Sequence, residues 1–136
     1  MVEGWRGLAQ VSEIGSERRP APSFGAAEET LARMQAGDEV IYRGVLIDRE
    51  TQTFGEPDLL VRSDVLNRFF PGEISAEDAA VWAPLFGSPW HYRVVDIKFT
   101  TLRLSIRGNL RLEGSAPAFR AQLFIYNRAL GRLQNY

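Results

Sequence analysis

The segment from Trp90 to Thr100 (WHYRVVDIKFT) constrains the fold more than any other stretch, because it reads as a buried strand that carries charge. Side chains of a strand alternate between its two faces, so Val94, Asp96 and Lys98 share one face. A charged group among β-branched residues costs free energy unless it is paired, hydrogen-bonded or bound to a metal. The segment therefore indicates either a functional site or an ordinary Asp–Lys pair on an edge strand.

Lys98 is the only lysine of the chain, since the other fifteen of its sixteen basic residues are arginine. A lysine ammonium is a compact point charge, whereas arginine presents a planar fork. The two differ most where a charge must approach a reacting oxygen, so a single lysine on this strand favours chemistry there.

Length and composition narrow the classes of protein. The 136 residues are enough for one domain with a core, and the chain contains no cysteine. Disulfides, thiolate metal sites, iron–sulfur clusters and cysteine nucleophiles are therefore excluded. The first residues lack the apolar core of a signal peptide, and no run is long enough to span a bilayer. We expect a cytoplasmic protein without a membrane partner.

Charge is distributed unevenly along the chain. Residues 1–88 hold eight arginines and fifteen acidic residues, a net charge of −7, whereas residues 89–136 carry a net charge of +6. A basic segment on an acidic body suits a phosphate backbone, although a solvated arginine face explains it equally well. The candidates for phosphate contact are arginines of this segment, Arg103, Arg107, Arg111 and Arg120.

Hydrophobic periodicity and turn signals predict the order of elements. Residues 1–24 lack sustained periodicity and are expected to form an extension or linker before a domain at residues 25–136. In order, the expected elements are a helix (26–35), an antiparallel hairpin (39–47 and 57–62), a short helix capped by Ser75 (to 85), the 90–100 strand, a hairpin turning at Gly108-Asn109, and a helix (115–133). The predicted class is α/β, a mixed central sheet flanked by helices with an inserted β-hairpin.

Asp58, at the start of the second strand, supplies a second carboxylate. Neighbouring strands lie about 4.8 Å apart, so Asp58 and Asp96 would share one hard cation if their strands are adjacent. Magnesium prefers oxygen ligands and keeps several waters, so two carboxylates and the Ile97 carbonyl would suffice as protein ligands. Lys98 would then orient or deprotonate the attacking water and stabilise charge on a phosphate.

Gln122 and Tyr126 lie four residues apart on the last predicted helix, so their side chains project side by side. Tyr126 also falls on the apolar stripe of that helix, where it is either part of a site or a core residue with a satisfied hydroxyl.

These residues carry a resemblance to a known family. The segments Gly-Glu-Pro-Asp-Leu-Leu-Val-Arg (55–62), Val-Val-Asp-Ile-Lys (94–98) and Gln-Leu-Phe-Ile-Tyr (122–126) resemble the signature of PD-(D/E)XK nucleases. The Gln-x-x-x-Tyr helix after the D-x-K strand is similar to that of the RecB-type branch. The resemblance implies a restriction-endonuclease-like fold over most of the chain, and a metal-dependent DNA nuclease acting in repair or recombination.

The resemblance also implies roles. Asp58 and Asp96 would bind Mg²⁺ or Mn²⁺, Lys98 would assist the water, and Gln122 and Tyr126 would organise the site and contact the DNA backbone. Many relatives add a ligand from the first helix, where Glu28, which is expected to face the body, is either that ligand or a partner of the helix dipole. A helicase, another repair protein or a missing neighbouring domain is the implied partner.

Two rival functions remain open at this point. The first is a catalytically silent module that holds nucleic acid without cutting it. The second is a structural domain whose arginine hairpin docks on an acidic protein.

Overall fold

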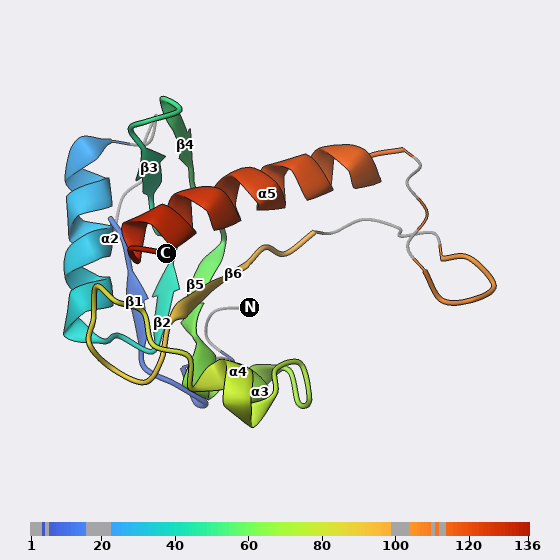
Figure 1. The fold of residues 1–136 in the computed structure, drawn as a ribbon, viewed down its shortest axis with the longest axis horizontal. Helices are drawn as coiled ribbons and strands as arrows, with labels where there is room; N and C mark the ends of the chain where they lie inside the picture. Colours follow the sequence, from blue (N-terminus) through green and yellow to red (C-terminus); the bar gives the residue numbers. More distant parts are fainter. Residues whose placement is uncertain (1–3, 5, 16–22, 99–103, 110, 112–113) are drawn as a thin grey trace.

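The protein is described from a computed structural model, which covers residue 4 and residues 6–15, 23–98, 104–109, 111 and 114–136. Its centre is a four-stranded sheet in the order β1-β2-β5-β6 (Figure 1). The strands are β1 (Val11–Glu13), β2 (Val40–Tyr42), β5 (Leu59–Arg62) and β6 (Tyr92–Val95). β1 runs parallel to β2, and the other neighbours are antiparallel. The predicted class, a mixed sheet flanked by helices, is confirmed at this level.

Two apolar clusters lie on opposite faces of the sheet, because β5 and β6 alternate their side chains. Leu60 joins the cluster beneath α2 (Phe24–Ala36) and α5 (Ala116–Leu133). Leu59 and Val61 join the cluster against α3 (Ser63–Phe69), near the short α4 (Ala76–Ala79). None of the helices within the described residues is long and apolar enough to cross a bilayer.

α2 confirms the first predicted helix and its stop signal. Ser23 caps it by accepting a hydrogen bond from the Ala26 N–H at 3.2 Å. Gly37 ends it in the left-handed region at φ 79°, where a residue without Cβ is favoured. Inside the helix, the buried Thr30 hydroxyl donates to the Ala26 carbonyl and accepts from the Val45 N–H at 2.8 Å, which ties α2 to the chain before β3.

The expected strand over residues 39–47 is wrong in its extent. The backbone turns at Arg43, which has φ 59°, and at Gly44, where an added Cβ would lie 2.9 Å from a Leu60 methyl. Only β2 therefore pairs with β5. The chain then forms a separate hairpin of β3 (Leu46–Asp48) and β4 (Thr53–Gly55), which packs against α5.

Other boundaries also differ from the sequence prediction. β6 ends at Val95 rather than Thr100, and α4 ends at Ala79 rather than at residue 85. The turn expected at Gly108-Asn109 instead begins at Ser105, whose carbonyl accepts from the Gly108 N–H at 2.9 Å. The strands expected beside this turn involve residues 99–103, 110 and 112–113, which lie outside the described residues. Part of the expected N-terminal extension joins the sheet as β1.

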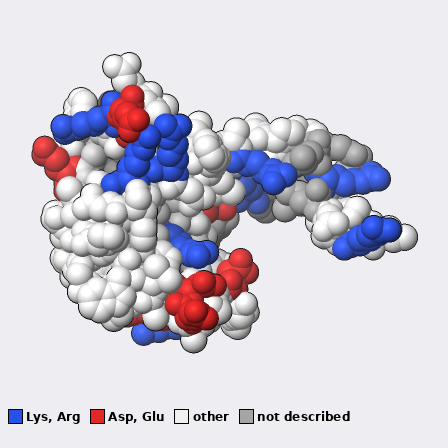
Figure 2. Space-filling view, in the orientation of Figure 1, with Lys and Arg blue, Asp and Glu red and all other residues white. Residues whose placement is uncertain are grey.

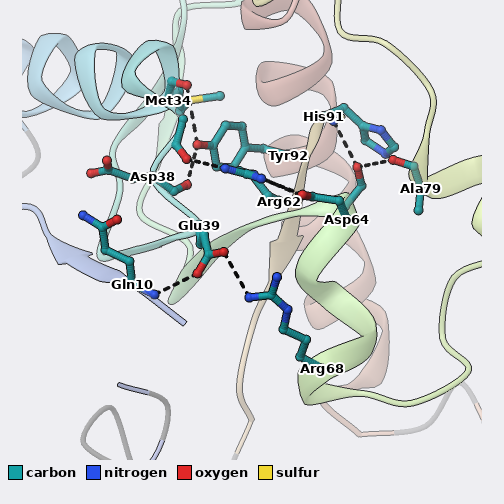
Figure 3. A network of polar contacts seen from close by, with 12 residues as sticks. Gln10, Met34, Asp38, Glu39, Arg62, Asp64, Arg68, Ala79, His91 and Tyr92 are labelled. Atoms are coloured by element: carbon teal, nitrogen blue, oxygen red, sulfur yellow. Dashed lines mark hydrogen bonds and ion pairs between the residues drawn. The ribbon is translucent and has the colours of Figure 1, made fainter. Parts of the chain in front are cut away.

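A polar network fixes one end of β5 and β6 to the end of α2 (Figure 3). The buried Tyr92 hydroxyl donates to the Asp38 carbonyl at 2.5 Å. The Arg62 guanidinium donates to the Gly37 carbonyl at 2.6 Å, pairs with Asp64 and lies 4.8 Å from the centre of the Trp90 ring. Asp58 and Asp96 lie at the opposite end of the same two strands.

Candidate metal centre

Asp58 and Asp96 meet at the end of the β5–β6 ladder. Leu59 pairs with Val95, so the next position in the same register sets Asp58 opposite Asp96 on the face towards α5. The backbone N–H of Ile97 donates to Asp58 Oδ2 at 2.6 Å, which holds the chain beside β5 after β6 has ended. The structure thus brings together the two carboxylates that the sequence singled out.

Lys98 lies against Asp96. Its Nζ is 2.6 Å from Asp96 Oδ2, and the Asp96 side chain is 4% exposed. This buried oxygen forms an ion pair, yet no donor of the described residues meets it in hydrogen-bonding alignment. The Asp96 carboxylate raises the pKa of Lys98, so the amine remains an ammonium. The Phe119 ring, with its centre 5.3 Å from Nζ, gives the ammonium a second neighbour.

The Asp96 carboxylate and the burial of Asp58 both oppose the ionisation of Asp58. The pKa of Asp58 is raised, first by burial and further by the neighbouring Asp96 carboxylate, although the Ile97 N–H and the Lys98 charge act in the opposite direction. Like charges directly opposite across a sheet are destabilising. The pair therefore holds excess negative charge that a proton or a cation can neutralise.

Gln122 and Tyr126 lie side by side, as the helical spacing predicts. The Gln122 Nε2 donates to the Tyr126 hydroxyl at 2.7 Å. Tyr126 is 7% exposed, and its ring lies so close to Gly55 that a Cβ added there would overlap it. Because Gly55 precedes Asp58 by three residues, this contact sets α5 beside the carboxylates. Tyr126 is therefore both a core residue and a neighbour of the centre.

Two other ligands were predicted, Glu28 and the Ile97 carbonyl. Glu28 is exposed on α2 and lines a shallow hollow with Leu31 and Leu133, so a ligand role for it stays a prediction. No group of three His, Cys, Asp or Glu side chains able to hold a metal is found within the described part of the chain. Ile97 contributes its N–H to Asp58, and a role for its carbonyl stays a prediction.

The candidate phosphate-binding arginines lie away from the body. Arg107 and Arg111 are exposed beside the Ser105 turn, Arg120 is exposed on α5, and Arg103 lies outside the described residues. Basic side chains lie along the arm that α5 and residues 104–109 form (Figure 2). Their contact with a nucleic acid stays a prediction.

Sequence reasoning missed two residues of this centre. Gly55 was part of the quoted motif, but its role as the seat of the Tyr126 ring was not foreseen. Phe119 lies three residues before Gln122, at a spacing that places both on one side of the helix. This spacing, together with the preference of the Lys98 ammonium for an aromatic face, could have identified Phe119.

Comparison of the chain with protein-family models, with curated proteins and with solved structures found no match. The case for the centre is therefore the geometry of Asp58, Asp96 and Lys98.

Proposed function

We propose that the chain is a Mg²⁺- or Mn²⁺-dependent nuclease with a restriction-endonuclease-like fold of the RecB type, which hydrolyses phosphodiester bonds of DNA. The observation that carries the proposal is the meeting of Asp58, Asp96 and Lys98, which are up to 40 residues apart in the sequence, at one end of the sheet. Their order and their surroundings on β5, β6 and α5 agree with the motifs quoted above.

The residues present fit a divalent cation. The two carboxylates face the single ammonium of Lys98, which lies 2.6 Å from Asp96 Oδ2, and the pKa of Asp58 is raised chiefly by burial and then by Asp96. Both features describe a site with anionic oxygens in excess. Magnesium keeps several waters and binds through one or two carboxylates together with substrate phosphates, so the absence of a third acidic ligand among the described residues is compatible with it. When bound, the cation would supply Lewis-acid stabilisation of the charge that develops on the phosphate.

Lys98 acts as a cation rather than as a base. Its pKa is raised by Asp96, so at neutral pH it carries a charge that stabilises negative phosphate oxygens. The side chain is partly exposed, at 29%, and can therefore reach a substrate while it keeps its contact with Asp96.

Gln122 and Tyr126 position the substrate. Gln122 donates to the Tyr126 oxygen, which leaves the hydroxyl hydrogen of Tyr126 available to a phosphate oxygen. The fixed place of the Tyr126 ring on Gly55 makes this donor rigid. The exposed arginines of the arm would bind the DNA backbone farther from the centre, and a helicase or repair partner is proposed from the resemblance.

A nicking assay on a supercoiled plasmid and on single-stranded circular DNA tests the proposal. We expect nicking in Mg²⁺ or Mn²⁺ and none in EDTA, with a loss of at least about 100-fold in Asp96→Asn, since such electrostatic groups contribute that much. Glu77→Gln, an exposed acid of α4, is the matched control and should retain full activity.

DNA binding measured on the same variants separates the rival functions. Asp96→Asn should still bind DNA, because it removes the chemistry and not the arginines. A wild-type chain that binds DNA but never cuts it in either metal would overturn the nuclease proposal in favour of a binding module. Equal nicking by Asp96→Asn and the wild type would also overturn it.

A further inference from the structure

A hollow of the described surface lies apart from the carboxylates, between the β3–β4 hairpin and the first turn of α2. It has a volume of about 700 Å³ and is lined by Phe24, Ile47, Asp48, Arg49, Gln52, Thr53 and Phe54. We call it the hairpin hollow. Nothing in the proposed chemistry at Asp58 and Asp96 uses these residues.

Two phenylalanines of the hairpin hollow are exposed. Phe24 is 68% exposed and Phe54 is 62% exposed, although each has a ring that burial would stabilise. Exposed apolar side chains that gather around a hollow mark binding sites more often than scattered ones do. Aromatic faces in such positions serve as platforms on which nucleic-acid bases stack without sequence preference.

The charge of the hairpin hollow suits a phosphate. Asp48 is buried in its wall, where Arg132 binds both carboxylate oxygens at 2.7 and 2.8 Å and Arg128 lies 3.8 Å away. Burial alone would raise the pKa of Asp48, but hydrogen bonds from Thr51 and Arg132 lower it to about 2, so its charge is fixed and compensated.

Arg49 is the cation that remains for a ligand. It is exposed in the same hollow, and no carboxylate of the described residues pairs with it. Figure 2 shows basic side chains, with acidic ones between them, over this hairpin, and further basic side chains along α5.

The hairpin hollow is also close to the candidate centre along the chain. Phe54 directly precedes Gly55, on which the Tyr126 ring lies, and Asp58 follows four residues after Phe54. Four residues of extended chain span at most roughly 14 Å. The backbone positions of Phe54 and Asp58 therefore lie within this distance of each other.

We propose that the hairpin hollow binds single-stranded nucleic acid, with unpaired bases stacked on Phe24 and Phe54 and a backbone phosphate on Arg49. This inference rests on the proposed nuclease function, which it deepens by naming an unpaired strand as the substrate. Free nucleotides offer the same base and phosphate, so the test must distinguish a strand from a mononucleotide.

The test is fluorescence anisotropy of a labelled oligothymidylate in EDTA, where no cleavage can occur. Phe54→Ala and Phe24→Ala should each weaken binding by about 5- to 150-fold, the range for loss of one stacked base. Phe54→Trp should restore it. Phe124→Ala is the matched control, because Phe124 is 65% exposed on α5 outside the hollow, and it should bind like the wild type.

A salt titration tests the phosphate contact separately. Arg49→Gln should reduce the slope of log K against log salt by roughly 0.7, as expected for one phosphate contact on a single strand. Duplex of the same length and thymidine monophosphate serve as competitors. Both should compete at least about tenfold more weakly than the oligonucleotide, because neither presents a run of unpaired bases.

Several results would overturn the inference. The first is an oligonucleotide affinity of Phe54→Ala equal to that of the wild type. The second is a loss of affinity in Phe124→Ala as large as that in Phe54→Ala. The third is competition by thymidine monophosphate as strong as that by the unlabelled oligonucleotide. Self-association that disappears in Phe54→Ala without a change in DNA affinity would show that the phenylalanines bind a second copy instead. Since every arm is run in EDTA, failure of nicking would leave these results intact and would count only against the nuclease.

Discussion

The ring of Tyr126 lies on the α-carbon of Gly55, so closely that no side chain fits between them. This contact joins the middle of α5 to the end of β4, three residues before Asp58. It also holds the hydroxyl that Gln122 orients. The place of the last helix beside the carboxylates therefore depends on a residue that carries no side chain.

Gly55→Ala tests this contact. The added methyl must displace the buried Tyr126 ring, and such overpacking destabilises by about 1–3 kcal/mol. We expect the free energy of unfolding, measured in urea, to fall by this amount, together with loss of nicking.

Gly131→Ala is the matched control for this substitution. Nothing lies within 4 Å of a Cβ built at Gly131 in α5, so its better helix propensity should stabilise the fold by up to about 1 kcal/mol. Equal stability of Gly55→Ala and the wild type would contradict the described contact.

The opposed carboxylates predict how stability depends on pH in the absence of metal. The folded-state pKa of Asp58 is raised above its ordinary value of 3.8, chiefly by burial and next by Asp96. The folded chain therefore holds this proton more tightly than the unfolded chain does. The stability that the proton supplies is fully present below pH 3.8 and is lost as the pH rises through the folded-state pKa.

Asp58→Asn should remove the loss of stability that accompanies the ionisation of Asp58. The amide can still accept the Ile97 N–H, but it carries no charge opposite Asp96. In EDTA at neutral pH we expect the variant to be more stable than the wild type by roughly 0.2–1 kcal/mol. Chemical denaturation at several pH values measures the difference. A variant that is less stable throughout would show that the two carboxylates do not repel each other.

Gln134 closes the open edge of β6. Its side-chain amide accepts from the Tyr92 N–H at 2.6 Å and donates to the Tyr92 carbonyl at 3.2 Å, as a neighbouring strand would. Gln134→Ala leaves both buried groups unpaired, which should cost about 1–3 kcal/mol in the free energy of unfolding. Gln35→Ala, at an exposed position of α2, should change it by less than about 0.5 kcal/mol. Similar stability of the two variants would show that Gln134 does not stabilise the edge of β6.

The sequence predicted those parts of the fold that local rules determine. The stop of α2 at Gly37, the start of α4 at Ser75, and the pairing of β2 with β5 all follow from side-chain chemistry and alternation, whereas the cap of α2 at Ser23 was not predicted. Nearness of Asp58 and Asp96 was predicted only on the condition that their strands are adjacent, and the pairing of β5 with β6 supplies that adjacency.

Long-range contacts determined the rest. The break at Arg43 and Gly44 lies where the chain passes close to Leu60, and within residues 39–47 the glycine itself was the local signal for it. β1 has three residues and depends on β2 for its hydrogen bonds, so its periodicity is too short to detect. The helical pattern placed Glu28 at the border of the apolar stripe of α2, and its exposure depends on how α2 is rotated against the body.

The most direct test of the candidate centre is Mn²⁺ binding followed by electron paramagnetic resonance of the free ion. The wild type should bind about one Mn²⁺ per chain, more tightly as the pH rises because the Asp58 proton must leave. Asp58→Asn and Asp96→Asn should abolish this binding, whereas Glu77→Gln should retain it. No binding by the wild type, or equal binding by Asp96→Asn, would contradict a divalent-cation centre at Asp58 and Asp96.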